Sequence, residues 1–376
     1  MINVKNFIIQ YLVKKRINRI NKIYNKKLKS LKNTQGNYVS KSVSLKHEEL
    51  WKSLTEKKIL TGWLNAYASV NNIEDEKYVP ESVYYSIIEP ILNIGLHSDS
   101  YSDKNFYDLL YSGDVFPLTI LRNIDGSFFG PEYMPINCYE NYIKKDCKDI
   151  DEIVVKPAIE SGGGAKVSLF TRSGDVFTNE RGEELSLEYV NRVYKENYVF
   201  QKVIKQHSFF KEFNPTSLNT IRVLTYKSVK TNKIDAIQSV LRVGAKGSFV
   251  DNSRAGGCSI GIKYDGVLND FATNKYGVAI QSVNSIDLSV PAKVYKYDEI
   301  IKLAKKIAIK NLHHRLLGLD MAVDANGSIR CVEVNNSGNE INFFQFNNGP
   351  LFGKYTDEVI EYCISKKYKL YNEYTF

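Results

Sequence analysis

The feature that most constrains the fold of this chain is a β-hairpin signal near its C-terminal end. Residues 315–336 read RLLGLDMAVDANGSIRCVEVNN, in which Asn-Gly at 326–327 separates two runs rich in apolar residues. Asn-Gly in this setting is the strongest short-range signal for two antiparallel strands joined by a two-residue turn. Such a turn pairs Ala325 with Ser328 and fixes the pairing of the residues further out.

The second strand of this hairpin carries polar side chains where a core strand would be apolar. Successive side chains of a strand point to opposite faces, so Val332 and Val334 share one face, and Glu333 and Asn335 share the other. Counting outward from the turn places Asp320 opposite Glu333. Opposed side chains lie about 4.5–5.5 Å apart, and like charges at that separation destabilise a sheet.

A hard cation would offset this repulsion. Mg²⁺ binds carboxylates together with the phosphate oxygens of a substrate. Two magnesium ions that share Glu333 would also explain the additional oxygen donor at Asn335. We therefore interpret Asp320, Glu333 and Asn335 as metal ligands. The alternative from the pattern alone is a solvated polar face on an exposed hairpin.

A glycine-rich segment that follows another predicted strand suggests a phosphate-binding loop. Lys156 ends the strand at 151–157, and the sequence SGGGAK follows at 161–166. Glycines allow backbone N–H groups to turn toward an anion because no Cβ is in the way. The spacing matches neither GxxxxGK nor GxGxxG, so a flexible surface loop is the alternative interpretation.

Two arginines lie inside apolar, β-rich segments. Arg222 belongs to 219–227 and Arg242 to 234–244, and we expect these two strands to be antiparallel neighbours. A guanidinium within such a strand is costly unless it is paired. Both side chains could bind phosphate or a developing oxyanion. An internal salt bridge with a carboxylate is the alternative for each.

The remaining pattern predicts an α+β fold. A chain of 376 residues with 43% hydrophobic and 25% charged residues suggests a globular protein of two or three domains. Strands and helices follow one another without regular β-α alternation, which favours α+β over a doubly wound parallel sheet. Besides the segments already named, we expect strands at 167–170 and 198–204 and a helix at 298–312.

The basic character of the chain is concentrated at its N-terminus. Residues 1–47 contain 12 Lys and Arg and no acidic residue, whereas the rest has 39 basic and 42 acidic residues. A basic amphipathic helix is typical of a protein that lies on an anionic membrane surface, here through residues 1–33. The alternative is a helix that packs on the body of the protein or on a partner. Nucleic acid is disfavoured because the body has no second basic patch with interleaved aromatics. Helical spacing joins the apolar residues of this arm into one stripe: Ile9, Val13, Ile17, Ile20, Tyr24, Leu28 and Leu31.

The sequence indicates a cytoplasmic protein. It has no run of about 18 apolar residues that would span a bilayer, and no secretory signal is expected from its N-terminal pattern. The five cysteines show no CxxC spacing and are expected to be free thiols in a reducing compartment. Together with the basic arm, this predicts a cytoplasmic protein that can associate peripherally with the inner face of the membrane.

Taken in order, these segments resemble the ATP-grasp superfamily, and most of all the sugar-transfer-associated ATP-grasp proteins of bacterial polysaccharide clusters. The resemblance covers about residues 100–350 and is carried by NTIRVLTY, LRVGAKGSFVDNSRAGG and GLDMAVDANGSIRCVEVNNSGN, which are also similar to the core of the ribosomal-protein glutamate ligases. It implies an ATP-grasp fold in which two α+β subdomains sandwich the nucleotide after a helical N-terminal region. The expected divisions are a basic helical arm at 1–47, a mostly helical acceptor-side region at 48–150, and ATP-grasp subdomains at 151–205 and 206–376.

The resemblance also implies roles for individual residues. Lys156 would bind the α- and β-phosphates of ATP, and the backbone of 201–204 would meet adenine, with Lys202 standing where relatives often have an acidic residue. Arg242 would stabilise the acyl phosphate and the tetrahedral intermediate, and Arg222 the phosphates or the acceptor carboxylate. The complete expected set is Lys156, Ser161, Gly162, Gly163, Gly164, Lys166, Gln201, Lys202, Val203 and Ile204 for ATP, Asp320, Glu333 and Asn335 for two Mg²⁺ ions, Arg222 and Arg242 for catalysis, and Asp251 and Asn252 for substrate.

The activity that the resemblance implies is an ATP- and Mg²⁺-dependent carboxylate–amine ligase. It would form an amide through an acyl-phosphate intermediate and release ADP. A uronic acid or another carboxylated sugar would be joined to an amino acid, an amino sugar or another amine. Two other functions stay open, a phosphotransferase that acts on a hydroxyl group and a non-catalytic nucleotide-binding tether in glycan assembly.

Overall fold

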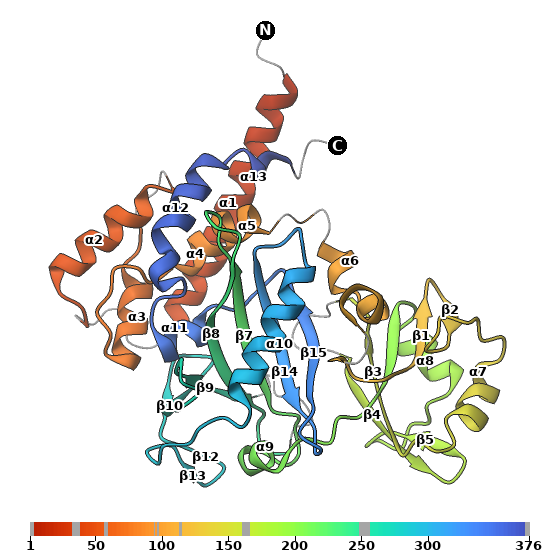
Figure 1. The fold of residues 1–376 in the computed structure, drawn as a ribbon. Helices are drawn as coiled ribbons and strands as arrows, with labels where there is room; N and C mark the ends of the chain where they lie inside the picture. Colours follow the sequence, from red (N-terminus) through yellow and green to blue (C-terminus); the bar gives the residue numbers. More distant parts are fainter. Residues whose placement is uncertain are drawn as a thin grey trace.

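Two antiparallel β-sheets organise the chain into two lobes, which Figure 1 shows beside each other. The arrangement agrees with the predicted α+β class and its two subdomains. The structure is a computed structural model, and it describes residues 4–31, 38–55, 59–93, 95, 98–112, 115–159, 166–247 and 256–372.

The small lobe contains a six-stranded sheet with the strand order β2-β1-β6-β3-β4-β5. Side chains of α7 (Tyr139–Asn141) and α8 (Leu187–Val193) pack with the strands in one hydrophobic core. The strands are β1 (Thr119–Ile124), β2 (Ser127–Phe129), β3 (Glu152–Pro157), β4 (Ser168–Ser173), β5 (Val176–Thr178) and β6 (Tyr198–Lys202).

This sheet begins earlier in the chain than the predicted subdomain 151–205. β1 and β2 lie within the region 48–150, which was expected to be mostly helical, yet β1 pairs with β6 inside the sheet. The hairpin of β1 and β2 turns at Asp125 and Gly126, both at positive φ. Asp-Gly is a known signal for this turn. The sequence therefore does indicate the hairpin, although its two strands are short.

The large lobe contains a seven-stranded sheet with the order β11-β10-β9-β8-β7-β14-β15. The prediction that the segments of Arg222 and Arg242 form antiparallel neighbours is confirmed, because these are β7 and β8. The strands are β7 (Thr220–Lys227), β8 (Ile234–Val243), β9 (Cys258–Ile262), β10 (Leu268–Asn274), β11 (Ala279–Ile280), β14 (Leu316–Val323) and β15 (Ile329–Asn335), and a separate ribbon is formed by β12 (Ser282–Val283) and β13 (Ile286–Asp287).

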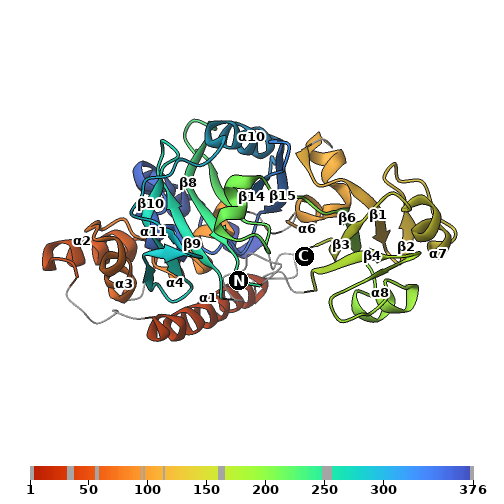
Figure 2. The ribbon, with the colours of Figure 1, turned by 90° about the horizontal axis from the view of Figure 1, so that it is seen from below.

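Helices cover both faces of the large sheet. The face that carries Leu319 and Met321 packs against α9 (Ser208–Phe213) and α10 (Tyr297–Lys310). The opposite face packs against the N-terminal helices and the C-terminal ones, so that α1 and α10 lie on opposite sides of the sheet in Figure 2. The helices of this second layer and its surroundings are α1 (Val4–Ser30), α2 (Lys41–Lys52), α3 (Gly62–Asn71), α4 (Glu81–Val83), α5 (Glu89–Leu92), α6 (Ser98–Ser102), α11 (Asn342–Asn348), α12 (Thr356–Ser365) and α13 (Lys369–Asn372).

The N-terminal helix α1 packs its apolar stripe on the large lobe, next to α4. Of the two alternatives for the stripe, the structure therefore has the one in which it contacts the body of the protein. Phe7, Ile8 and Tyr11 lie outside this contact and are exposed near the beginning of the helix. Across the described parts of the chain, no helix has the length and hydrophobicity needed to cross a bilayer. The buried residues of the stripe are Ile9, Val13, Leu28 and Leu31.

The predicted C-terminal hairpin is present, but its turn has three residues. The N–H of Asp324 donates to the carbonyl of Ser328 at 2.9 Å, which leaves 325–327 as the loop. Gly327 has φ +80°, in the left-handed region that favours glycine. The Asp324 carboxylate accepts hydrogen bonds from the N–H groups of Asn326 and Ser328 at 3.0 and 2.9 Å and so stabilises the longer loop. The predicted two-residue turn is therefore wrong.

A β-bulge further along the hairpin compensates for the longer turn. Met321 pairs with Cys331, and the next pair along the strands skips Val332, which is the extra residue of the bulge. The core face accordingly takes Cys331 and Val334, and Val332 lies outside that core. Beyond the bulge the register has the predicted pairs, Asp320 with Glu333 and Gly318 with Asn335.

Candidate active site

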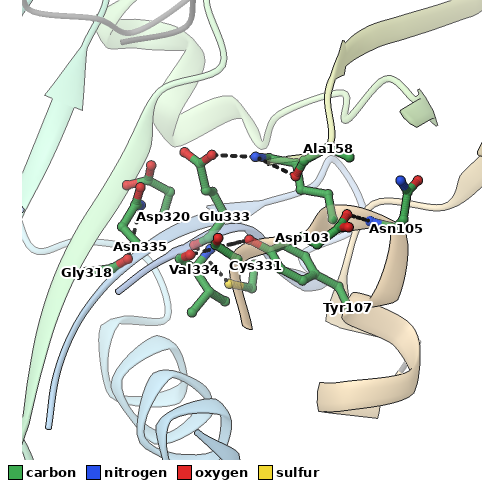
Figure 3. A network of polar contacts seen from close by, with 12 residues as sticks. Asp103, Asn105, Tyr107, Ala158, Gly318, Asp320, Cys331, Glu333, Val334 and Asn335 are labelled. Carbon is green, nitrogen blue, oxygen red and sulfur yellow. Dashed lines mark hydrogen bonds and ion pairs between the residues drawn. The ribbon is translucent and has the colours of Figure 1, made fainter. Parts of the chain in front are cut away.

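The opposed carboxylates of the hairpin lie in a mostly buried site on the part of the large sheet that is nearest the small lobe. Figure 3 shows the carboxylates of Asp320 and Glu333 pointing to the same side of the hairpin. Asp320 is 5% exposed and Asn335 7% exposed, so the alternative of a solvated hairpin face does not apply. The Nδ2 of Asn335 donates to the Gly318 carbonyl at 3.1 Å. The amide oxygen of Asn335 is thus the atom that a ligand would use.

Arg222 and Arg242 both bind Asp320. Arg222 contacts both carboxylate oxygens, with Nη2 at 2.7 Å from Oδ2 and with Nε bonded to Oδ1. The Nη1 of Arg242 lies 3.3 Å from Oδ2. These are the internal salt bridges that the sequence left open as an alternative. Protein cations therefore offset the repulsion between the carboxylates in this structure, where the sequence argument invoked a metal ion.

Lys104 is a site residue that the sequence analysis missed. Its Nζ lies 2.7 Å from the Oε1 of Glu333, and the lysine is only 5% exposed. Burial by itself raises the pKa of Glu333, but Lys104, Lys156 and Arg222 outweigh that effect and lower the pKa to about 2. Tyr107, three residues on, accepts from the N–H of Val334 at 3.1 Å. The segment 104–107 thus covers the outer edge of β15, a tertiary contact for which no local sequence signal exists.

Lys156 lies at the end of β3, in the small lobe, and is buried close to the same charges. Burial lowers the pKa of Lys156 to about 8, Lys104 adds to the shift, and Glu333 and Asp320 oppose it. A buried ammonium of this kind is stabilised by an incoming anion. That Lys156 binds phosphate stays a prediction.

The segment expected to meet adenine connects the two lobes. Gln201 is buried in β6, Lys202 is exposed, and the chain then continues to a backbone bond from His207 N to Val323 O at 2.9 Å. Gln201 Oε1 is buried and has no hydrogen-bond partner among the described residues. Lys166 is exposed with φ +60°. The expected residues Ser161, Gly162, Gly163, Gly164, Asp251 and Asn252 lie outside the described residues.

Asn339 is a second polar residue that the sequence analysis did not place in the site. It is buried, and within the described chain its Oδ1 has no hydrogen-bond partner. This oxygen lies over Gly318, where a Cβ would meet it at 2.3 Å and would meet the Cδ of Arg222 at 3.3 Å. Glycine at 318 therefore allows the amide of Asn339 to sit beside Arg222.

The donor set fits magnesium and a polyphosphate. Over the residues that the structure describes, no three His, Cys, Asp or Glu side chains gather as a metal-binding cluster. The hairpin offers two carboxylates and one carboxamide oxygen instead, and Mg²⁺ characteristically takes one or two carboxylates and completes its shell with phosphate oxygens and water. Lys104, Lys156 and the two arginines supply positive charge around these ligands.

Two lobes joined by a short connection, with paired carboxylates and buried cations where they meet, are the arrangement that the resemblance to ATP-grasp proteins implied. Residues 130–359 match the family described as sugar-transfer associated ATP-grasp, and the chain belongs to that family. No curated protein sequence matches the chain.

Solved structures that resemble the chain include three ligases or synthetases. They are the ATP-grasp ligase PsnB complexed with minimal precursor, Mg and ADP (14% identity, TM-score 0.37, 71% of this chain and 61% of that chain), N5-carboxyaminoimidazole synthetase from Staphylococcus aureus complexed with ADP (12%, 0.38, 68% and 52%), and D-alanyl-alanine synthetase A from Vibrio cholerae O1 biovar eltor (12%, 0.39, 72% and 65%). The chain thus spans between about half and two thirds of the length of these proteins. The likeness concerns the fold alone.

Proposed function

We propose that the protein is an ATP- and Mg²⁺-dependent ligase that joins a carboxylate to an amine. The observation that carries this proposal is the convergence on one hairpin of two opposed carboxylates, Asp320 and Glu333, with buried cations from both lobes. Such a set can neutralise a triphosphate and position it, which is most of what phosphoryl transfer requires of a protein. Membership of the family supports the same assignment.

The proposed reaction has two steps. An oxygen of the substrate carboxylate attacks the γ-phosphorus, the bond from that phosphorus to the β-phosphate bridge breaks, and ADP leaves. The amine then attacks the acyl carbon, phosphate leaves with the oxygen that came from the carboxylate, and the nitrogen loses a proton. Asp320, Glu333 and Asn335 would hold Mg²⁺, which we propose to be two ions, and the bound metal would neutralise charge on the phosphates.

The other residues have distinct proposed roles. Lys156 and the loop 161–166 hold the phosphates, and the backbone of 201–204 holds adenine. Arg242 stabilises the oxyanion that forms when the amine attacks, as preorganised cations do in acyl transfer. Arg222 holds phosphate or the acceptor carboxylate, and it is already oriented by its bidentate contact with Asp320. Asp251 and Asn252 contribute on the substrate side.

The proposed substrates are a carboxylated sugar or glycan precursor and an amino acid or other amine. The family description supports this choice. The proposed location is the cytoplasm, at the inner face of the membrane where lipid-linked glycans are assembled. The exposed apolar residues Phe7, Ile8 and Tyr11 on a basic helix support that location.

Isotope transfer tests the reaction. The chain is incubated with ATP, Mg²⁺, an amino-acid mixture and uronic acids labelled with ¹⁸O in the carboxylate, and products and phosphate are analysed by mass spectrometry. A ligase moves one label into phosphate, whereas a phosphotransferase that acts on a hydroxyl yields a phosphorylated sugar that keeps both labels.

Matched variants test the site. We expect Glu333→Ala to abolish ATP turnover and Glu361→Ala to leave it unchanged, because Glu361 is an exposed residue paired only at the surface with Lys230. A wild-type protein that binds nucleotide but turns over no ATP with any substrate pair would favour the tether and contradict the ligase.

A further inference from the structure

A cavity of about 580 Å³ lies between α1, the end of β10 and the chain that follows β15. This volume falls in the range of about 300–1,000 Å³ that is typical of small-molecule sites. The lining residues include Tyr24 and Lys27 of α1, Ser259 of β9, Phe343 of α11, and two further tyrosines, Tyr85 and Tyr276.

The cavity continues the active face of the large sheet. Ser259 is the direct partner of Arg242 in the β8–β9 pair, and Thr273 is the partner of Ser259 in the next pair. Directly opposed residues of an antiparallel pair point to the same face. Ser259 and Thr273 therefore lie on the face of Arg242, one and two strands further from the hairpin, and both line the cavity.

The end of the cavity that is nearest the hairpin is formed by the chain after Asn335. Gly338 and Glu340 line the cavity and flank Asn339, whose amide oxygen lies over Gly318. The cavity therefore borders the segment whose Asn339 lies over Gly318 and beside Arg222. An acceptor site has to lie next to the site of phosphoryl transfer, and this cavity does.

The walls combine flat aromatic rings with hydrogen-bonding groups. Tyr24 and Tyr85 stack with ring centroids 4.5 Å apart and planes inclined by 11°, and Tyr276 and Phe343 add further rings. Burial raises the pKa of Tyr24 above its ordinary value, which already exceeds physiological pH, so its hydroxyl is neutral. Hydroxyl and amide groups come from Ser259, Thr273, Asn274 and Asn342. A sugar ring presents C–H groups on its flat faces and hydroxyls at its rim, and it matches both kinds of group.

The wall from α1 lies outside the part of the chain that matches the family, residues 130–359. Its position is fixed by Lys27, whose Nζ lies 2.8 Å from the Oε1 of the buried Glu81. The N-terminal helix α1 thus forms one wall of the cavity, and its ion pair with a buried carboxylate holds it there.

We propose that this cavity is the acceptor site and that it binds a sugar ring between α1 and the sheet. Its part in the reaction rests on the proposed ligase function, whereas sugar binding itself does not. The N-terminal helix then determines which acceptor the protein accepts.

Saturation-transfer NMR on the full chain tests the proposal, with D-glucose, N-acetyl-D-glucosamine and D-glucuronate as the probes. Two variants change the cavity: Ile23→Trp fills it from α1, where Ile23 is 54% exposed, and Tyr276→Ala removes a ring that is 46% exposed. Their exposure makes both changes compatible with folding. Ile309→Trp on α10 and Tyr368→Ala are matched controls at exposed positions outside the cavity.

We expect transfer to at least one of the three sugars in the wild type and the controls, and a loss of about tenfold in both cavity variants. No transfer to any sugar from the wild type, or equal transfer in the cavity variants, would overturn the proposal. Calorimetry with Mg²⁺-ADP on the same samples reports the nucleotide site separately. A wild type that binds sugar but not Mg²⁺-ADP would refute the ligase and leave the sugar site standing, and cavity variants that lose both ligands would refute the sugar site.

Discussion

Four buried or half-buried charges surround the pair Asp320 and Glu333, and each of the two carboxylates has a cation within hydrogen-bonding distance. A buried ion pair is costly to break because it leaves one charge without compensation. The site is therefore held in one arrangement before any ligand binds. Burial lowers the pKa of one of these cations, Lys156, to about 8.

The pKa of Lys156 predicts a pH dependence for nucleotide binding. Burial lowers this pKa to about 8, so the ammonium is mostly charged below that pH and loses its proton as the pH rises through it. Its attraction to phosphate is lost in the same direction. We expect the dissociation constant of Mg²⁺-ADP, measured by calorimetry, to rise by up to about tenfold per pH unit above about pH 8.

The matched variant for this experiment is Lys156→Arg. A guanidinium keeps its charge throughout this range, so the profile should become flat between pH 7 and 9. Parallel profiles in the wild type and the variant would show that another group controls the pH dependence.

The close packing around Gly318 predicts that a larger side chain at this position lowers the stability of the fold. In Gly318→Ala the new methyl group would lie 2.3 Å from the Oδ1 of Asn339, and overpacking of a buried site costs about 1–3 kcal/mol. We expect the free energy of unfolding in urea to fall by that amount. Adding Asn339→Ala removes the clashing oxygen, so the double variant should recover part of the loss, and additive losses would contradict the contact.

At the scale of elements, the C-terminal hairpin shows how far the sequence can be interpreted. Asn-Gly and the alternation of polar residues predicted the strands and the opposition of Asp320 to Glu333. The turn is one residue longer than predicted because the carboxylate of Asp324 binds the N–H groups of the loop. The bulge at Val332 then restores the register. The longer turn depends on a contact within the loop, from Asp324 to N–H groups two and four residues on. The bulge is a shift of register that strand propensity does not encode.

In the hairpin loop, one carboxylate oxygen of Asp324 accepts both backbone hydrogen bonds. We therefore expect this oxygen to contribute to the stability of the fold. Asp324→Ala removes the acceptor of two backbone hydrogen bonds and the 3.3 Å contact with Arg330. We expect a loss of about 1–2 kcal/mol in the free energy of unfolding. Asp324→Asn keeps the amide oxygen as acceptor and should lose less than about 0.5 kcal/mol. Equal losses in the two variants would assign the stability to the ion pair with Arg330.

At the scale of the whole molecule, the sequence predicted the hairpin with its opposed carboxylates and the two arginines beside it, but not the residues that reach them from elsewhere. Lys104 and Glu333 are 229 positions apart, and α1 meets the chain after β15 across an even longer separation. Periodicity describes which face of an element is apolar, but it does not say which other element covers that face. The apolar stripe of α1 was compatible with contact to a membrane or to the body of the protein, and in the structure it packs on the body.

The remaining exposed surface of α1 predicts membrane binding at one end of the molecule. Phe7, Ile8 and Tyr11 are exposed, and Figure 1 shows the first turns of α1 extending beyond the neighbouring helices. Apolar residues on a basic helix insert into an anionic interface. We expect the chain to sediment with phosphatidylglycerol-containing vesicles and not with neutral ones.

Introducing Glu at both Phe7 and Tyr11 should weaken this binding by about tenfold or more. Leu312→Glu is the control, since Leu312 is an equally exposed apolar residue in another part of the molecule. Binding that persists in the double variant would assign the vesicle interaction to a different surface.

The contact between Lys104 and Glu333 bears on the order in which ligands arrive. A divalent ion that bound alone would have to displace the ammonium of Lys104 from Glu333. Lys104 would then be buried without an anionic partner. A polyphosphate that came with the ion would offer Lys104 a new anion at the same moment. In the proposed site, Lys104 would thus occupy the position of the metal ion until the nucleotide binds, and uptake of the ion would be coupled to uptake of the nucleotide.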